Sequence, residues 1–289
     1  MLKSRLCIAF FAFAVGCAPA QKPLTDYVNP MLGTATLWDS VDLGFKPTKR
    51  TWGAEVFPGS SLPNAMVQVS PVTKFHSGAG YQYEDSVIYG FTHTNKGHWN
   101  LCHIPLLPVT GTPTPGDYCS PFSHERESAA PGYYQVFLDR YGVDAQLSST
   151  LRCAFHKYTY PAGAAASLLA DLQRSNEHVR AWDIRKEGDN VFAGWQQTGE
   201  KMYFYAVANR PVTGIEPVVE GDREVRIVRF GEGDGALELR IGFSFVSEKN
   251  ARENLEAEML GKSFAEVRSE ATATWNDLLG RIRVEGGTE

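Results

Sequence analysis

The sequence lacks an excess of positive charge. Its 289 residues include 28 Lys and Arg against 33 Asp and Glu, which gives a formal net charge of −5. A nucleic-acid-binding surface needs a concentrated excess of basic side chains. We therefore expect no nucleic-acid partner.

Cysteine is also scarce. Of the 5 cysteines, Cys102, Cys119 and Cys153 follow the N-terminal segment, and no CxxC or Cys/His zinc spacing is present. An odd number of cysteines does not close a disulfide framework. A Cys102–Cys119 bridge and burial as small apolar side chains both remain open, and burial is favoured.

The sequence has no apolar run long enough to cross a membrane. The run at 6–15 follows two basic residues and has about half of the ~20 residues that a membrane span needs. This pattern is typical of a secretory signal peptide, predicted at 1–20. Cleavage before Gln21 and lipidation of Cys17 in a lipoprotein-like box remain open. Either route predicts an exported protein that contacts a membrane only through a lipid anchor.

No βαβ rhythm and no phosphate-binding Gly-rich loop appears, which disfavours a nucleotide-binding α/β fold. Instead, short runs of alternating apolar and polar residues are separated by turns that contain Gly or Pro. The clearest alternation is at 237–245, and similar runs occur at 134–138, 151–160, 201–208 and 225–230. A period of two places one face of each strand in a core. The chain is therefore predicted to be all-β, with a β-sandwich domain at 21–247.

A helical pattern replaces the strands at 248–289. Asn250 is predicted to cap a first helix that ends near Gly261, and Ser263 with Glu266 forms a capping box for a second. Apolar residues then recur at helical spacing and predict a buried stripe: Phe264, Val267, Ala271, Trp275, Leu278 and Ile282.

Two long loops contain the side chains that suit a sugar ligand. Within 36–59, Trp52 offers a stacking face flanked by Arg50 and Glu55, although a purely structural loop is equally favoured. Within 89–103, three His, two Asn, a Lys and a Trp supply hydrogen-bonding groups and one aromatic face.

In the second of these loops, His93, His98 and Trp99 are the candidate ligand contacts. Structural hydrogen bonding is the alternative for the histidines. Their spacing of five residues argues against a metal site, because no i, i+4 pair and no HExxH motif is present.

A third loop, 111–131, contains the charged segment Ser123–Glu127, which is predicted to be a solvated rim. No GxSxG motif positions a serine, so a hydrolase triad is not supported. Paired carboxylates for glycoside hydrolysis cannot be recognised from spacing, because the two groups act across space.

A series of motifs occurs in order along the chain: Tyr27–Thr34, Phe57–Pro71, Gly80–Tyr83, Ile88–Thr94, Leu107–Gly111, Ala130–Tyr134 and Phe155–Pro161. With these motifs the sequence resembles glycoside hydrolase family 92, the exported calcium-dependent exo-α-mannosidases. The resemblance extends over about residues 27–285.

The resemblance implies a large antiparallel β-supersandwich, a short helical linker at 248–289, and a C-terminal (α/α)6 barrel beyond this sequence. It also implies that the general acid, the general base and most calcium ligands belong to that barrel. We therefore expect no catalytic or metal-binding residue in this chain. His98 and Trp99 would contact the glycan on the leaving-group side.

The expected function is that of the N-terminal portion of an inverting exo-α-mannosidase. It would remove terminal mannose from mannose-containing oligosaccharides or mannans, in the periplasm or at the cell surface of a Gram-negative bacterium. Its other partner would be its own C-terminal domain. The alternative is a non-catalytic carbohydrate-binding module of the same fold.

Overall fold

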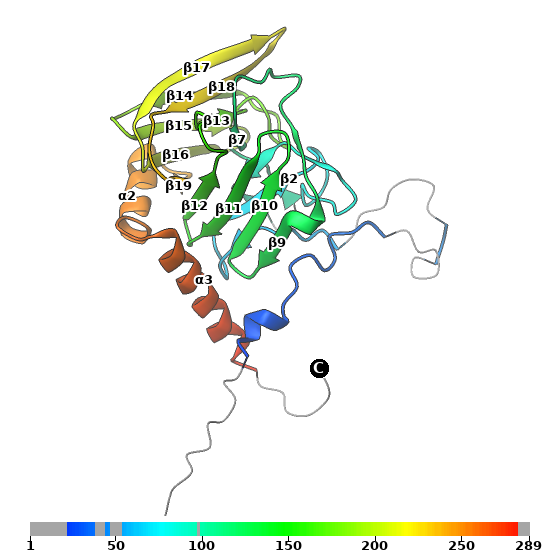
Figure 1. The fold of residues 1–289 in the computed structure, drawn as a ribbon. Helices are drawn as coiled ribbons and strands as arrows, with labels where there is room; N and C mark the ends of the chain where they lie inside the picture. The colour runs from blue at the N-terminus through cyan, green and yellow to red at the C-terminus, as the bar shows by residue number, and fades with distance from the viewer. Residues whose placement is uncertain (1–21, 38–43, 47–53, 97–98, 283–289) are drawn as a thin grey trace, which may run out of the picture.

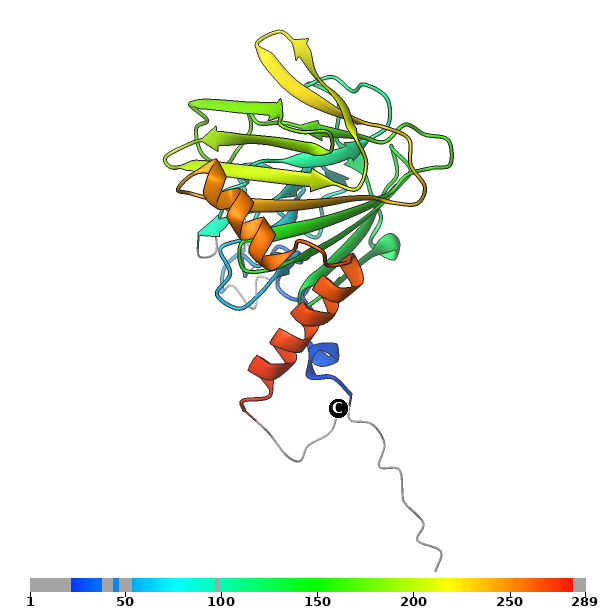
Figure 2. The ribbon, with the colours of Figure 1, turned by 90° about the vertical axis from the view of Figure 1, so that its left-hand side faces the viewer.

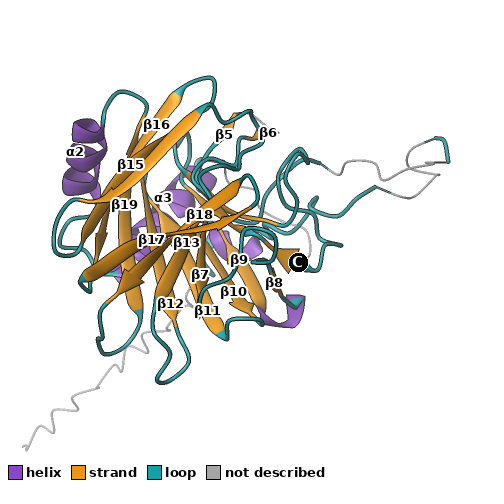
Figure 3. Ribbon diagram, turned by 90° about the horizontal axis from the view of Figure 1, so that it is seen from above, coloured by secondary structure: helices purple, strands orange, loops and turns teal. Residues whose placement is uncertain are grey.

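A computed structural model describes residues 22–37, 44–46, 54–96 and 99–282. Two large antiparallel sheets pack face to face, with two helices beside one of them (Figure 1). Figure 3 looks down on the stacked sheets from above. The prediction of an all-β sandwich followed by a helical segment is confirmed.

The first sheet has seven strands. Their order across the sheet is β1 (Ser60–Ser61), β2 (Gln68–Val72), β4 (Gly90–Thr92), β7 (Leu106–Val109), β13 (Ser167–Ala170), β18 (Arg223–Phe230) and β17 (Val212–Glu220).

The second sheet has eight strands. Their order is β14 (Ala181–Lys186), β15 (Val191–Gln197), β16 (Lys201–Ala208), β19 (Leu237–Ser244), β12 (Cys153–Thr159), β11 (Val143–Ser149), β10 (Tyr133–Leu138) and β9 (Glu127–Ala130).

Short pairs and turns complete the described fold. β3 (Val87–Ile88) pairs with β8 (Ser120–Pro121), and β5 (Asn95–Lys96) pairs with β6 (Trp99–Asn100). The 3₁₀ turns are η1 (Leu24–Tyr27) and η2 (His124–Arg126).

The alternating pattern determines which side chains fill the space between the sheets. In β19, Leu237, Leu239 and Ile241 are fully buried, whereas the Glu and Arg between them are half-buried on the other face. β16 alternates in the same way over its full length. The predicted strands at 201–208 and 237–245 are thus confirmed, the second ending one residue earlier.

Helix α2 (Glu248–Glu258) lies on the outer face of the eight-stranded sheet (Figure 2). The predicted start at Asn250 is wrong: Ser247 is the cap, and its hydroxyl accepts the Asn250 N–H at 3.1 Å. The helix approaches the sheet closely at Gly242, where an added Cβ would lie 2.1 Å from the Ala251 carbonyl oxygen. A glycine is therefore needed at this contact.

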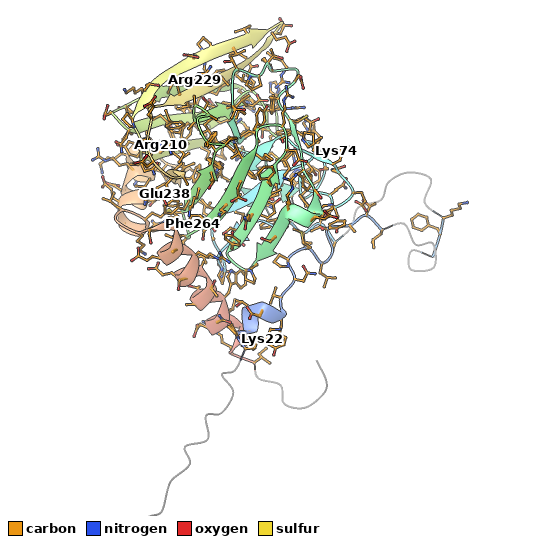
Figure 4. The ribbon with its side chains drawn as sticks, in the orientation of Figure 1. Lys22, Lys74, Arg210, Arg229, Glu238 and Phe264 are labelled. Atoms are coloured by element: carbon orange, nitrogen blue, oxygen red, sulfur yellow. The ribbon has the colours of Figure 1, made fainter. Side chains whose placement is uncertain are left out.

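Helix α3 (Phe264–Leu279) begins with the predicted capping box of Ser263 and Glu266. Phe264, which lies where α3 leaves the sheet in Figure 4, packs with Tyr133, Phe155 and Leu255 in a second apolar cluster. The predicted stripe is correct at its start. It is wrong at Ile282, which lies beyond the helix and is 81% exposed.

The charged segment Ser123–Glu127 fits the prediction of a solvated rim at Glu125 and Arg126, which are exposed, but not at Glu127. The Glu127 side chain is 1% exposed, and its carboxylate accepts the hydroxyls of Tyr81 at 3.0 Å and Tyr134 at 2.5 Å. The ring nitrogens of His124 face Glu127 Oε2 at 2.6 Å and the Tyr83 carbonyl oxygen at 2.7 Å. This carboxylate therefore ties together segments that are distant in the sequence.

The cysteines form no disulfide among the described residues. Cys102, Cys119 and Cys153 are free thiols, and the first and third are buried. Burial raises the pKa of both buried thiols above the usual range. These two cysteines act as small apolar core residues.

Candidate functional site

The residues predicted to contact a glycan fall into two groups. Arg50, Trp52 and His98 lie outside the described residues, whereas Glu55, His93 and Trp99 lie within them. Glu55 and Trp99 are both half-buried. The Glu55 side chain lies against Gly78, and the Gly78 carbonyl accepts the N–H of Asn100, the neighbour of Trp99. The fold thus brings Glu55 and Trp99 into one cluster of loops.

His93 lies elsewhere. Its ring is fully buried between the two sheets, where its Nε2 meets His156 Nε2 at 3.1 Å and its ring centroid lies 4.6 Å from that of Phe243. Burial lowers the pKa of His93 to about 3, although the backbone groups of His103 and Ile104 oppose that shift. These contacts favour the structural alternative for this residue.

Three loops meet at the end of the sandwich beside Trp99: residues 73–80, 100–105 and 171–180. Asn176, in the third loop, bonds to the other two. Its Oδ1 accepts the His76 N–H at 2.6 Å. Its Nδ2 donates to the Asn100 carbonyl at 2.6 Å, and its backbone N–H donates to the Leu101 carbonyl at 3.0 Å. One side chain therefore fixes the relative positions of these loops.

The backbone of these loops is strained. Of the five non-glycine residues with positive φ among the described residues, three lie here: His76 at 59°, Cys102 at 53° and Ile104 at 53°. Such conformations cost energy and are often found at functional sites.

A buried polar chain leads from the core to the surface of this cluster. Thr198 Oγ1 donates to Glu177 Oε2 at 2.5 Å and lies 3.0 Å from His103 Nε2, while His103 Nδ1 lies 2.9 Å from Thr94 Oγ1. Because the Thr198 proton goes to Glu177, His103 donates from Nε2 and accepts at Nδ1. Burial lowers the pKa of His103, and Glu177 opposes that shift. These hydrogen bonds fix the position of the Glu177 carboxylate.

An open cleft of about 740 Å³ lies along this surface. It is lined mainly by polar side chains from the loop between β13 and β14: His76, Gln173, Arg174, Ser175, Asn176, Glu177, His178, Val179, Arg180, Ala181 and Trp182. The lining combines hydrogen-bond donors, one carboxylate and one large aromatic side chain. A polyhydroxylated ligand needs this combination.

Arg174 forms part of the fixed wall of the cleft. Its guanidinium lies 4.5 Å from the ring centroid of Phe75 and 4.9 Å from that of Tyr89, and it donates to the Tyr118 hydroxyl at 3.2 Å. The Tyr118 hydroxyl in turn donates to the fully buried Asp171 at 2.6 Å. The wall is thus anchored to a buried carboxylate.

The cleft is better suited to binding than to hydrolysis. Among the described residues that line it, Glu177 is the one carboxylate, whereas hydrolysis of a glycosidic bond uses two. Nor do the described ranges contain a group of three or more His, Cys, Asp or Glu that could hold a metal ion.

The segment 171–182 was not predicted from the sequence. Its one local signal is the polar run Arg174–His178 between two strands, which also suits an ordinary solvated turn. None of the described helices is both long and apolar enough to cross a membrane.

Comparisons with known proteins point to one family. Residues 27–254 match the glycosyl hydrolase family 92 N-terminal domain, and residues 250–289 match the glycosyl hydrolase family 92 catalytic domain. An uncharacterized secreted glycosidase of Arthroderma benhamiae is 24% identical over 314 residues, which cover 90% of this chain and 38% of that protein.

Solved structures of Bacteroides thetaiotaomicron proteins share the fold. A family GH92 α-mannosidase superposes with a TM-score of 0.80 at 25% identity, over 92% of this chain and 39% of that one. Its complex with mannoimidazole gives a TM-score of 0.77 at 25% identity, over 90% and 37%. A family GH92 inverting mannosidase gives 0.76 at 25% identity, over 91% and 37%. The chain thus spans less than two fifths of the length of these relatives.

Proposed function

The chain belongs to glycosyl hydrolase family 92, and from that membership we propose that it is the N-terminal portion of an exported, calcium-dependent, inverting exo-α-mannosidase. The substrates would be glycans or mannans with terminal mannose. The match of residues 27–254 to the family's N-terminal domain carries this proposal. The α-mannosidase relative and its mannoimidazole complex support a mannose-type ligand.

In this proposal the loop cluster forms part of the substrate-binding surface. Arg174, Asn176 and Arg180 would donate hydrogen bonds to sugar hydroxyls, and Glu177 would accept one. Trp99, with His98 beside it, would stack on the sugar on the leaving-group side. The three loops are held by buried hydrogen bonds, so these groups need little reordering when a glycan binds.

The acid, the base and the calcium ligands are proposed to lie in a C-terminal (α/α)6 domain. Inversion needs a water between two carboxyl groups about 6.5–9.5 Å apart. Calcium, when bound there, would hold the sugar hydroxyls. This chain's own contribution would be to bind and orient the glycan.

The test is an assay of the complete protein on soluble α-mannosides. We expect release of mannose with inverted anomeric configuration, read by proton NMR in the first minutes, and loss of turnover with a calcium chelator that added calcium restores. A protein that binds mannan without releasing mannose would be the carbohydrate-binding module instead. Turnover with retained configuration would reject the inverting mechanism.

Export is tested separately by mass spectrometry of the native N-terminus. A start at Gln21 supports cleavage of a signal peptide, and a diacylated Cys17 supports a lipid anchor. An intact Met1 would contradict both routes.

A further inference from the structure

A row of aromatic side chains crosses the outer face of the eight-stranded sheet, away from the core. Trp195 of β15 lies directly opposite Tyr203 of β16 and, on its other side, opposite Asp183 of β14. The residues that flank Trp195 and Tyr203 along their strands are buried. By the alternation of a β-strand, the two aromatic side chains therefore project from the outer face, where both are partly exposed.

Helix α2 covers the neighbouring row of the same face. There, Arg252 lies 5.7 Å from the ring centroid of Tyr205, and the helix backbone packs directly on Gly242. Figure 2 shows α2 lying across one side of this face, with β14, β15 and β16 extending beyond it. Trp195 and Tyr203 lie one row further along.

A cationic side chain, Lys201, lies over the indole ring of Trp195. The Lys201 ammonium lies 3.7 Å from the ring centroid of Trp195 and 5.6 Å from that of Tyr203. The C–H bonds on the apolar face of a pyranose are attracted to the same electron-rich surface. Lys201 is a long, flexible side chain, so it can move aside and donate to a sugar hydroxyl.

Polar side chains border this aromatic row. Asp183, whose side chain is 46% exposed, supplies an acceptor. Gln197, opposite both Ala181 and Lys201, supplies a donor and an acceptor. A pyranose presents one apolar face surrounded by hydroxyl groups. The two aromatic rings match the apolar face, and the polar side chains around them match the hydroxyl groups.

The surface area that Trp195 and Tyr203 offer is too small for a stable protein interface. Two aromatic side chains offer at most about 150–250 Å² each, whereas a stable protein interface buries roughly 800 Å² on each side. One or two sugar rings fit that area.

We propose that Trp195 and Tyr203, with Asp183, Gln197 and Lys201 around them, form a platform that binds one or two pyranose units of a polysaccharide. The platform lies on the outer face of the sheet and borders the cleft at Gln197, whose cross-strand partner Ala181 lines the cleft. It performs no chemistry. It would hold a polymeric glycan close to the protein and so raise the local concentration of chain ends.

The test is affinity electrophoresis of the complete protein in gels that contain soluble α-mannan, mixed-linkage β-glucan or xylan. We expect retardation in at least one gel. Trp195→Ala and Tyr203→Ala should each weaken it by about fivefold or more, and Tyr203→Phe, which keeps the ring, should bind like the wild type. Turnover of a small aryl α-mannoside should be unchanged in all three variants.

Thermal unfolding of each variant reports whether it folds. If Trp195→Ala does not fold, the half-buried rim residues are replaced instead, in Asp183→Ala and Gln197→Ala, and weaker retardation in either supports the platform. The proposal is overturned if the wild type is not retarded in any gel, as it would be if the rest of the protein covered this face. It is also overturned if the alanine variants of Trp195, Tyr203, Asp183 and Gln197 all bind like the wild type. A variant that loses retardation and aryl α-mannoside turnover together would overturn it as well. Retardation that depends on Trp195 in a protein without mannosidase activity would reject the proposed function but support the platform.

Discussion

His93 and His156 come from opposite sheets and meet in the core, with 3.1 Å between their Nε2 atoms. His93 directly follows β4 of the seven-stranded sheet, and His156 lies in β12 of the eight-stranded sheet. One ring donates and the other accepts, so this contact needs at least one neutral imidazole. Burial lowers the pKa of His93 to about 3 and that of His156 well below its usual value.

This pair predicts a loss of stability in mild acid. Both rings stay neutral in the folded protein but take up protons in the unfolded chain below a pH of about 6.5. The free energy of unfolding should therefore fall as the pH decreases from about 6.5 toward 3, by about 2 kcal/mol at pH 5 for His93, and His156 should add to this loss. Urea unfolding at pH 7.5 and pH 5 measures the difference.

His156→Gln should be less stable than the wild type at pH 7.5 but lose less stability between pH 7.5 and 5. His178→Gln is the control, because His178 is exposed and should leave the pH dependence as it is. An unchanged pH dependence in His156→Gln would show that the buried pair does not cause the acid sensitivity.

Glu127 gives a second prediction, on stability alone. Glu127→Ala leaves the Tyr81 and Tyr134 hydroxyls and the His124 ring without their shared acceptor. The two Tyr hydroxyls are buried, and unpaired buried polar groups cost about 1–3 kcal/mol each, so we expect a loss of about 2–6 kcal/mol in denaturant unfolding. Glu125→Ala, two residues away and exposed, should change stability by less than about 0.5 kcal/mol. Equal effects from the two variants would contradict a structural role for the buried carboxylate.

Features that depend on nearby residues were predictable from the sequence. The alternation in β16 and β19 and the capping box at Ser263 each require only neighbours within a few positions. The sequence pattern places the start of α2 three residues too late, because Ser247 and Asn250 are both good N-cap residues and the local sequence does not choose between them.

Features that depend on distant pairing were not predictable. The sequence around His93 suits either a ligand contact or a core residue, and His156, 63 residues away, decides between them. The cleft is similar: Asn176 organises it by binding the backbone of His76, which is 100 residues away. No local periodicity encodes such contacts, so the sequence alone does not identify the segment 171–182 as a site.

The position of Asn176 gives a third prediction. Asn176→Ala leaves the His76 N–H and the Asn100 carbonyl without their partners and frees the three loops from one another. We expect a loss of about 1–3 kcal/mol in stability, together with a lower kcat/KM on soluble mannosides in the complete protein. Asn209→Ala is a matched control, because Asn209 also bonds two backbone groups, the Ala236 carbonyl and the Glu238 N–H. That control should lose stability but keep its kcat/KM. A normal kcat/KM in folded Asn176→Ala would show that the cleft does not take part in substrate binding.

Trp99 gives the last prediction. It begins β6, pairs with Lys96 across a two-stranded ribbon and is half-buried beside the loops of the cleft. If its ring stacks on the sugar on the leaving-group side, Trp99→Ala in the complete protein should lower kcat/KM by about tenfold, since an aromatic stack and its hydrophobic contact are each worth on the order of 1 kcal/mol. Trp99→Phe keeps an aromatic face and should lose about threefold or less. If Trp99 only supports the ribbon, Trp99→Ala will instead melt at a lower temperature while the protein that remains folded keeps its kcat/KM. Kinetics and thermal unfolding on the same preparations therefore separate the two roles.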